Sequence, residues 1–334
     1  MNTRMLGAAG PMVAPVGIGA MSFAGVYGQT SDQEAHAILD AALELGINHI
    51  DTSNVYGMGQ SEKMIGSYLA KHGPAVRDQF VIATKAGIMR DPDSGVRYFN
   101  NSRDHLAAEL DGSLKRLGTD CVDLFYVHRR QADVEIEDVT HTLASFIADG
   151  KIRAFGYSEI APTSLRRANA VHPVAAVQSE YSLSTRYAQL GLVQECDRSG
   201  TSLVAFSPVG RGLLTDTPPD RARVDKIPFL QSNPRFMGSN LAANIAAVKP
   251  FQQLAADMGT SSAALAIAWL LAQSDRVITI PGTRSVSHLG ELAAGAELKL
   301  SQDDLARINV ALPVGWAHGD RYSVDQWNGP EKYS

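Results

Sequence analysis

Short apolar segments alternate with longer amphipathic segments through most of this chain, and this alternation constrains its fold more than any other feature. The short segments have the length of strands and are mostly apolar, as is typical of strands in a buried parallel sheet. The longer segments have helical spacing, and Ser31 with Glu34 forms a capping-box sequence before the first of them. The predicted strands are residues 16–19, 48–51, 80–85, 121–127, 152–157, 175–180, 202–206 and 277–281. The predicted helices are residues 32–45, 62–71, 103–117, 137–149, 162–170, 190–199, 241–258, 261–273 and 287–296.

This succession of strand–helix pairs favours an α/β fold of the (β/α)8 TIM-barrel type, in which a parallel sheet closes on itself. The alternative is an open, doubly wound sheet of the Rossmann type. Its glycine fingerprint is incomplete, because Ser22 stands where a third glycine should follow Gly17 and Gly19, and no helix begins there. No linker or change of composition divides the chain, so we expect a single domain over residues 1–334.

Two segments depart from the repeat. Residues 5–15 predict an N-terminal β-hairpin that closes the bottom of the barrel. Residues 210–240, after the seventh strand, contain Pro218, Pro219, Pro228 and Pro234 and have no regular period. These features predict a long loop without a packed element, and loops of this length are commonly lids or disordered segments. We expect this loop to be mobile and to close over a bound ligand.

Composition excludes several classes of protein. Hydrophobic residues make up 45% of the chain and charged residues 19%, which is the balance of a globular protein with a sizeable core. The net charge of −5 argues against a nucleic-acid partner, which would need a basic face. Cys121 and Cys196 are too few for a disulfide framework or a zinc cluster, which fits a reducing, cytoplasmic compartment. The sequence shows no signal peptide and no apolar run of the ~20 residues that a membrane span needs. A homo-oligomer is left open.

Titratable residues stand at the ends of three neighbouring strands. Asp51 ends the second strand and Tyr56 follows it closely, while Lys85 ends the third strand and His128 follows the fourth. In a parallel barrel these strand ends meet at one mouth. Each residue alone also has a structural explanation, as a buried Lys–Asp pair or a satisfied core histidine. Their joint placement indicates a catalytic site.

These residue types suit the reduction of a carbonyl group, which needs a proton donor at the oxygen. A free phenol titrates near ~10, so Tyr56 needs help from the cation of Lys85, which we expect to lower its pKa. Asp51 would anchor that lysine, and His128 would orient and polarise the carbonyl. A Schiff-base lysine is the alternative, but Asp51 should keep Lys85 cationic and non-nucleophilic. His49 and Asp51 have a metal-site spacing, but no further ligands gather nearby and no metal site is expected.

The same residues, with the sequence around them, resemble the aldo-keto reductase family. Four segments carry the likeness beside the four catalytic candidates: GINHIDTS at 46–53, TDCVDL at 119–124, GKIRAFG at 150–156 and AFSPVGRGL at 205–213. The similarity covers residues 5–312 and is nearest to the bacterial and plant branch of NADPH-dependent carbonyl reductases. It implies hydride transfer from NADPH to an aldehyde or ketone, reversible as alcohol oxidation, with Tyr56 as general acid. The alternative, from a different class, is an NADPH-binding redox sensor or regulatory subunit with slow turnover, like potassium-channel β-subunits.

The resemblance also implies a set of NADPH contacts. Ser158, Glu159 and Gln178 would hold the nicotinamide carboxamide, although Glu159 stands where much of the family has Asn and so lacks a donor. Arg284, with Gly282 and the following helix N-terminus, forms an anion site suited to the 2′-phosphate of NADPH. Leu292 replaces a usual Asn at the adenine. The full predicted set is Gly19, Met21, Asp51, Ser158, Glu159, Gln178, Phe206, Ser207, Pro208, Val209, Gly210, Arg211, Gly212, Gly282, Thr283, Arg284, His288 and Glu291.

Substrate specificity should come from the loops after strands one, three and four and from the aromatic C-terminal tail. We expect the small-molecule carbonyl substrate to contact Phe23, Tyr27, Ile88, Tyr98, Phe99, Arg129, Trp316, Tyr322 and Trp327. Arg129, next to His128, would favour a polar or anionic substrate, or else is a solvated surface charge. None of these residues identifies a particular molecule.

Overall fold

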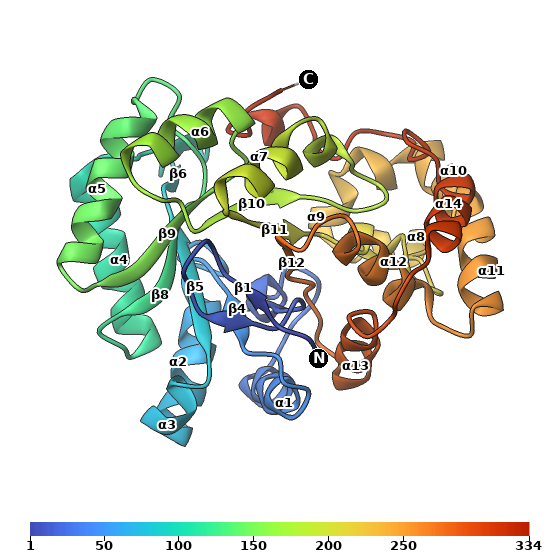
Figure 1. The fold of residues 1–334 in the computed structure, drawn as a ribbon, viewed down its shortest axis with the longest axis horizontal. Coiled ribbons are helices and arrows are strands. Elements are labelled where there is room, and N and C mark those ends of the chain that lie inside the picture. The colour runs from blue at the N-terminus through green and yellow to red at the C-terminus, as the bar shows by residue number, and fades with distance from the viewer. Residues whose placement is uncertain (334) are drawn as a thin grey trace.

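The computed structural model describes residues 1–333 and contains one continuous parallel sheet with helices outside it (Figure 1). All the predicted strands are present, in the sheet order β12-β11-β10-β9-β8-β5-β4-β3. Their bounds are β3 (Ile18–Gly19), β4 (His49–Asp51), β5 (Val81–Ala86), β8 (Val122–Val127), β9 (Ile152–Ser158), β10 (Ala176–Glu180), β11 (Ser202–Phe206) and β12 (Val277–Thr279).

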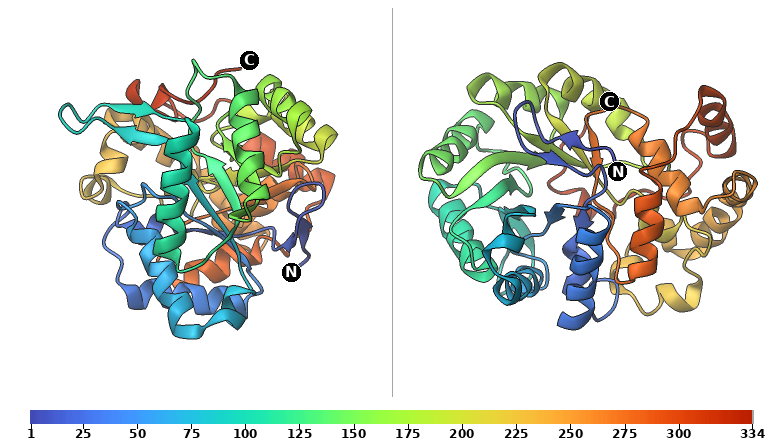
Figure 2. Two further views of the ribbon diagram at one scale, coloured as in Figure 1. Left: turned by 90° about the vertical axis from the view of Figure 1, so that its left-hand side faces the viewer. Right: turned by 60° about the horizontal axis from the view of Figure 1, so that its bottom comes forward.

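Backbone hydrogen bonds close the sheet between its first and last strands. The Gly17 N–H donates to the Thr279 carbonyl at 2.7 Å, and the Thr279 N–H donates to the Pro15 carbonyl at 2.8 Å. Figure 2 shows the resulting ring of helices around the strands. The TIM-barrel prediction is therefore confirmed, and the open-sheet alternative is wrong.

The helices follow the predicted amphipathic segments closely, and the capping box of Ser31 and Glu34 is present. The predicted helix 241–258 is divided at Val248 into two helices, just before Pro250, which has no N–H to donate to the preceding turn. The helix α14 and the short α3 were not predicted. The helices are α1 (Asp32–Glu44), α2 (Gln60–His72), α3 (Pro74–Arg77), α4 (Arg103–Leu117), α5 (Ile136–Ala148), α6 (Pro162–Val171), α7 (Leu192–Ser199), α8 (Arg221–Val224), α9 (Pro228–Gln231), α10 (Gly238–Ala247), α11 (Lys249–Asp257), α12 (Ser262–Leu271), α13 (Val286–Ala294) and α14 (Gln302–Ala311).

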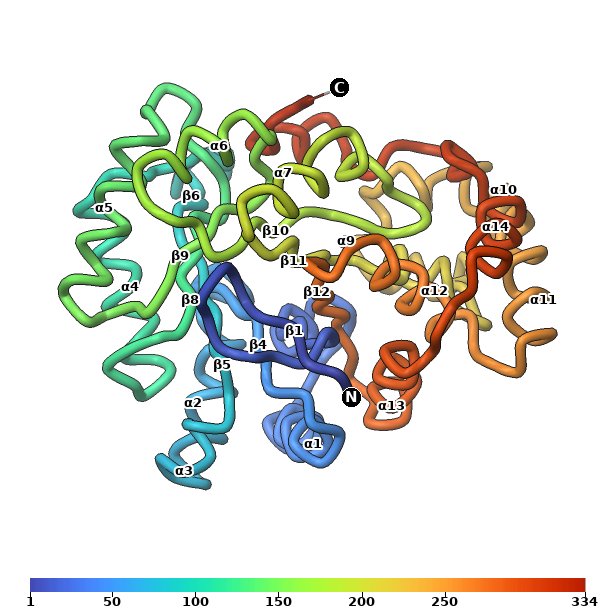
Figure 3. Tube along the Cα trace, viewed as in Figure 1, coloured from blue at the N-terminus to red at the C-terminus, as the bar shows by residue number. Residues whose placement is uncertain are grey.

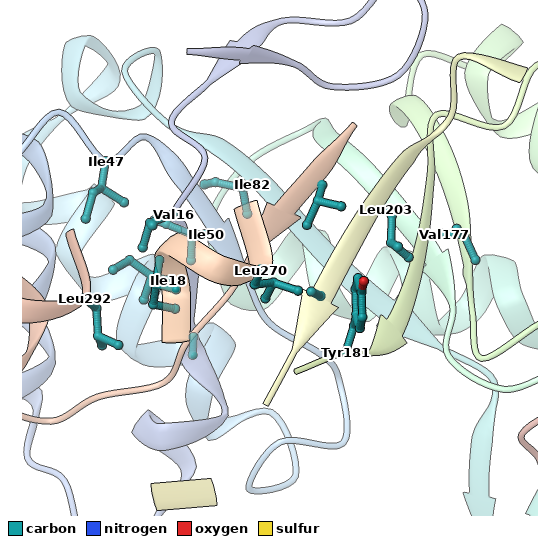
Figure 4. Close-up of a cluster of buried hydrophobic side chains, with 14 of the residues drawn as sticks. Val16, Ile18, Ile47, Ile50, Ile82, Val177, Tyr181, Leu203, Leu270 and Leu292 are labelled. Atoms are coloured by element: carbon teal, nitrogen blue, oxygen red, sulfur yellow. The ribbon is translucent and has the colours of Figure 1, made fainter. Parts of the chain in front are cut away.

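Two apolar layers hold the barrel together. Outward-facing strand residues such as Ile82 and Leu203 pack against the helices, including Leu270 of α12 and Leu292 of α13 (Figure 4). Inward-facing residues form a separate inner core, which consists of Val81, Ala83, Leu124, Tyr126, Ala176, Val204, Ile278 and Ile280. Leu6 and Val13, from the predicted hairpin β1 (Arg4–Met5) and β2 (Met12–Val13), belong to this inner core and cover the bottom of the barrel.

The loop that follows β11 is packed, contrary to expectation. It contains α8, α9 and two 3-10 turns, η3 (Gly210–Gly212) and η4 (Pro234–Phe236). Its apolar side chains form their own cluster, consisting of Leu213, Val224, Ile227, Leu230, Phe236 and Leu241. The prediction of a segment without packed elements is wrong, because short helices of a single turn leave no periodic signal in the sequence.

The C-terminal tail crosses the carboxyl ends of the strands, where the red end of the chain runs over the barrel in Figure 3. The hairpin of β6 (Ile88–Arg90) and β7 (Arg97–Phe99), after β5, lies beside it, because Arg97 donates to tail carbonyls at Asp325, Gln326 and Asn328. By length and composition no single helix of residues 1–333 could span a membrane, whereas one sharply bent pair, Gly238–Asp257 with Ser262–Leu271, passes that test.

Candidate active site

The inward-facing rows of the barrel continue into the site. In β5, Val81 and Ala83 belong to the inner core, and the next inward residue is Lys85. In β8, Leu124 and Tyr126 belong to the same core. Because side chains alternate along a strand, the next inward residue after them is His128. Along each of these strands, the side chains that face the barrel interior are therefore apolar lower down and polar at the mouth.

Lys85 lies at the centre of the predicted catalytic group. Its side chain is fully buried, and its ammonium donates to the Asp51 carboxylate, to the Thr52 carbonyl at 2.8 Å and to the Tyr56 hydroxyl at 3.3 Å. The Tyr56 ring stands edge-on to the His128 ring, with 5.8 Å between their centroids. The structure thus brings together the four residues that the sequence predicts.

The pKa of Tyr56 moves in the opposite direction from the one expected. Burial raises the pKa of this phenol, and the cation of Lys85 offsets this effect without reversing it. For Lys85, burial alone would lower the pKa, but Asp51 and Tyr56 together raise it above its ordinary value. At neutral pH the site therefore holds an ammonium beside a protonated phenol, as a proton donor requires.

His128 is neutral in this environment. Its pKa lies well below the ordinary value because the ring is buried and because three cations, Arg129, Lys85 and Arg97, stand near it. Its Nδ1 lies 3.1 Å from the Ser53 hydroxyl. No group in the described part of the chain bonds to Nε2, which is the nitrogen available to a substrate. Ser53 was not predicted, although it ends the GINHIDTS segment that carries Asp51.

The predicted carboxamide contacts already have protein partners. Ser158 Oγ accepts a hydrogen bond from Arg129 at 2.9 Å, and the Gln178 amide donates to Asp51 at 2.8 Å. Glu159 has a left-handed backbone with a φ of 58°, and its carboxylate pairs with both terminal nitrogens of Arg321. The Ser158 hydroxyl hydrogen and Gln178 Oε1 remain free for a ligand.

A buried ionic network that was not predicted lies beside these residues. Glu180, fully buried, accepts two hydrogen bonds from Arg211, at 2.9 and 2.7 Å, and lies 3.5 Å from Arg235 and 3.9 Å from Arg321. Burial alone would raise the pKa of Glu180, but Arg211, Arg321 and Arg235 together hold it below its ordinary value. Arg211, expected at the pyrophosphate, has its guanidinium in this pair, so a pyrophosphate there must rely on backbone N–H groups.

The predicted site of the 2′-phosphate of NADPH consists of Arg284, Gly282 and the N-terminus of α13. A Cβ on Gly19 would lie 2.5 Å from the Ile280 carbonyl oxygen and 3.3 Å from the Gly282 nitrogen, so there is no room for a side chain at this position. Arg284 donates through one nitrogen to the Gln29 carbonyl at 2.9 Å and leaves the other unbonded. His288 and Glu291 are exposed along α13, whose first turn is capped by Ser285. The helix N-terminus and the guanidinium together suit an anion.

The predicted substrate residues separate into three groups. Tyr322 and Arg129 are buried together at the mouth, and the Trp327 ring lies 5.6 Å from that of Tyr322. Trp316 donates instead to the Leu183 carbonyl and packs on the outer core. Phe23 is also buried in that outer core. The others lie on flanking loops: Tyr27 against Phe229, and Ile88, Tyr98 and Phe99 on the β6–β7 hairpin.

No group of three or more His, Cys, Asp or Glu residues in the described chain could hold a metal ion. His49, considered above for its spacing, donates through Nδ1 to the Val81 carbonyl at 3.0 Å. The side chain is fully buried, and burial lowers its pKa. It is a core residue of the barrel interior.

Comparison with known proteins gives one consistent result. A family model described as the aldo/keto reductase family matches residues 15–312. The aldo-keto reductase yakc [NADP(+)] of Schizosaccharomyces pombe is 36% identical over 96% of this chain and 94% of its own length. The probable aldo-keto reductase 1 of Glycine max is 34% identical over 98% and 93%. Among solved structures, a glycerol dehydrogenase from Gluconobacter oxydans is similar with a TM-score of 0.80 and 26% identity, over 93% and 94% of the two chains.

Proposed function

The chain belongs to the aldo/keto reductase family of NADP-dependent oxidoreductases, and we propose that it reduces an aldehyde or ketone with a hydride from NADPH. The observation that carries this proposal is the contact of the Tyr56 hydroxyl with Lys85, beside a neutral His128. The relatives are named as reductases and a dehydrogenase, which does not favour the alternative of a regulatory subunit.

Each residue of the site has a separate role in the reduction. When the Ser53 hydroxyl donates to His128 Nδ1, the ring proton is on Nε2, where it can hold the carbonyl oxygen. Tyr56 then gives its proton to the developing alkoxide, which is more basic than the phenolate left behind. Lys85 stabilises that phenolate, and Asp51 keeps the lysine charged. In alcohol oxidation the same groups act in reverse.

The residues present fit NADPH. Phe206 offers a half-buried ring for stacking, and Ser158 and Gln178 keep one polar group each for the carboxamide. Arg284 and the N-terminus of α13 would hold the 2′-phosphate. The hydride comes from the nicotinamide when the cofactor is bound.

The proposal is tested by steady-state oxidation of NADPH with a panel of aldehydes and ketones. We expect turnover numbers in the range of roughly 1–10³ s⁻¹ that is typical of enzymes. A protein that binds NADPH tightly, yet turns over every member of the panel several orders of magnitude more slowly, would be a sensor and not a reductase.

A further inference from the structure

Arg129 is a buried cation without a carboxylate partner. Its side chain is 8% exposed, and none of residues 1–333 places a carboxylate within 4 Å of it. One terminal nitrogen donates to the His128 carbonyl at 2.6 Å and to Ser158 Oγ at 2.9 Å. A guanidinium stays charged at any physiological pH, and burying a charge without a counter-ion is costly.

Other arginines near this mouth have a carboxylate within salt-bridge distance, although the buried Arg235 shares Glu180 with Arg211. Arg211 pairs with Glu180, Arg321 pairs with Glu159, and Arg130 pairs with the carboxylate of Glu331 at 2.6 Å. The Nε atoms of these arginines also lack partners, so an unbonded Nε is not what distinguishes Arg129. The distinguishing feature of Arg129 is its missing carboxylate.

A second cation strengthens the positive field. Arg97, half-buried on β7, donates to three tail carbonyls, and no carboxylate within the described chain lies within salt-bridge distance of it. Lys85 and Asp51 cancel each other. The side of the site that holds His128 therefore carries two positive charges that the protein does not neutralise.

We propose that Arg129 binds a carboxylate on the carbonyl substrate, so that the enzyme prefers aldehydes or ketones carrying an acid group. This inference rests on the proposed function, because it names the substrate class of the same site. Arg129 adjoins His128 in sequence, so an acid held there lies close to the residue that receives the carbonyl oxygen. Its side chain touches Ser158 on one side and Tyr322 on the other.

The free edge of the guanidinium suits this ligand. Nε and Nη2 lie along one edge of the planar group, which matches the two oxygens of a carboxylate. Among residues 1–333, Nε has no hydrogen-bond partner and is shielded from solvent, so a ligand must displace the atoms that cover it, and Nη2 reaches the Tyr322 hydroxyl at 3.5 Å, the outer limit of a hydrogen bond. A carboxylate would replace this weak contact by two charge-assisted ones.

The test compares a charged substrate with an uncharged analogue of similar shape. We would measure kcat/KM for 4-carboxybenzaldehyde and for its methyl ester, with wild type and with Arg129→Met. The wild type should prefer the acid, and Arg129→Met should lower kcat/KM for the acid by about 10- to 150-fold, as expected for a lost charge-assisted contact. The ester should change by less than about threefold, because it makes no such contact. Glyoxylate against acetaldehyde repeats the comparison with a shorter spacing.

The controls separate this proposal from a structural role. Arg130→Met removes the neighbouring arginine, whose charge is already neutralised, and should leave the acid preference intact. Arg129→Lys keeps the charge without the fork and should retain part of the preference. Equal losses for acid and ester, or a weaker Kd for NADPH that accounts for the loss, would overturn the proposal and show that Arg129 acts through Ser158. Glyceraldehyde 3-phosphate preferred over every carboxylate would also overturn it in favour of a phosphate. If wild type reduced other aldehydes or ketones but not the acid, this proposal would fail, whereas the proposed function itself would fail only if no member of the panel were reduced.

Discussion

At the scale of single residues, the site depends on where charge is held. Lys85 and Asp51 form a buried pair, and Tyr56 next to them keeps its proton because burial outweighs the effect of the lysine. The sequence predicts these residues and their meeting place from the strand ends. It does not predict the direction of the pKa shift of Tyr56, because burial depends on the side chains that close the mouth from distant segments.

The raised pKa of Tyr56 and the lowered pKa of His128 predict the pH dependence. Reduction needs protonated Tyr56, so its rate should stay level from about pH 6 to about pH 9 and fall only above the ordinary phenol value of ~10. Alcohol oxidation needs the phenolate, so its rate should rise as pH increases from about pH 6 to about pH 10, because the fraction of phenolate grows. Stopped-flow hydride transfer in both directions measures this. If the rate of reduction fell with rising pH with a midpoint near pH 7–8, the pKa of Tyr56 would be lowered, and the effect of Lys85 on it would outweigh that of burial.

At the scale of elements, the predicted strands were right because each is a continuous apolar run with a polar end. The helix α14 was missed although Ser301 and Asp304 cap it, since it lies beyond the last strand of the repeat. The β6–β7 hairpin was missed because residues 88–99 contain no strand-length apolar run. The turns of the loop after β11 pack through a few scattered apolar residues, which no local period reveals.

The N-terminus of α13 is predicted to select the cofactor. Arg284→Ala should raise the Kd for NADPH far more than that for NADH, so that the preference shrinks by ~10–150-fold, the size of a charge-assisted contact. Titration of cofactor binding by fluorescence measures both constants. Arg307→Ala, which removes an exposed cation on α14, serves as the control. Equal losses for both cofactors would remove Arg284 from the 2′-phosphate site.

The loop after β11 is predicted to close as a packed unit. Arg235 fixes one end through Thr185, at 2.8 Å, and the segment Asp216–Arg235 follows the predicted pyrophosphate-binding run in the sequence. NADPH contacts should reduce local opening of this packed segment, so amide exchange across it should slow when cofactor is added. Peptides from α4 should show no change and serve as the internal reference. Unchanged exchange across the loop at saturating NADPH would make it a fixed insertion.

At the scale of the whole molecule, the tail ties the C-terminus to the barrel mouth. Arg321 reaches Glu159 across 162 residues of sequence, and Tyr322 covers Arg129. The Glu331 carboxylate accepts from the Ala161 N–H at 2.7 Å and pairs with Arg130. Contacts at such separations leave no local signal, so the sequence indicated the aromatic tail as part of the site but not its ionic anchor.

This anchor should contribute strongly to stability. Arg321→Met leaves the buried carboxylate of Glu159 without its partner, and breaking a buried ion pair from one side costs about 3–5 kcal/mol. Urea unfolding measures the loss. The double variant Glu159→Gln with Arg321→Met should recover much of it, because the buried charge is then gone. A single variant as stable as wild type would show that the tail is not held by this pair.

The central claim is that Tyr56 delivers the proton in a hydride transfer, and single-turnover reduction by Tyr56→Phe tests it most directly. The variant should bind NADPH with nearly unchanged Kd and transfer hydride at least ~10²-fold more slowly, the usual scale for a lost acid. Tyr68→Phe loses a hydroxyl that bonds Asp40 at 2.7 Å, outside the site, and should react like wild type. If Tyr56→Phe kept more than about a third of the wild-type rate, Tyr56 would not be the proton donor and the account would be contradicted.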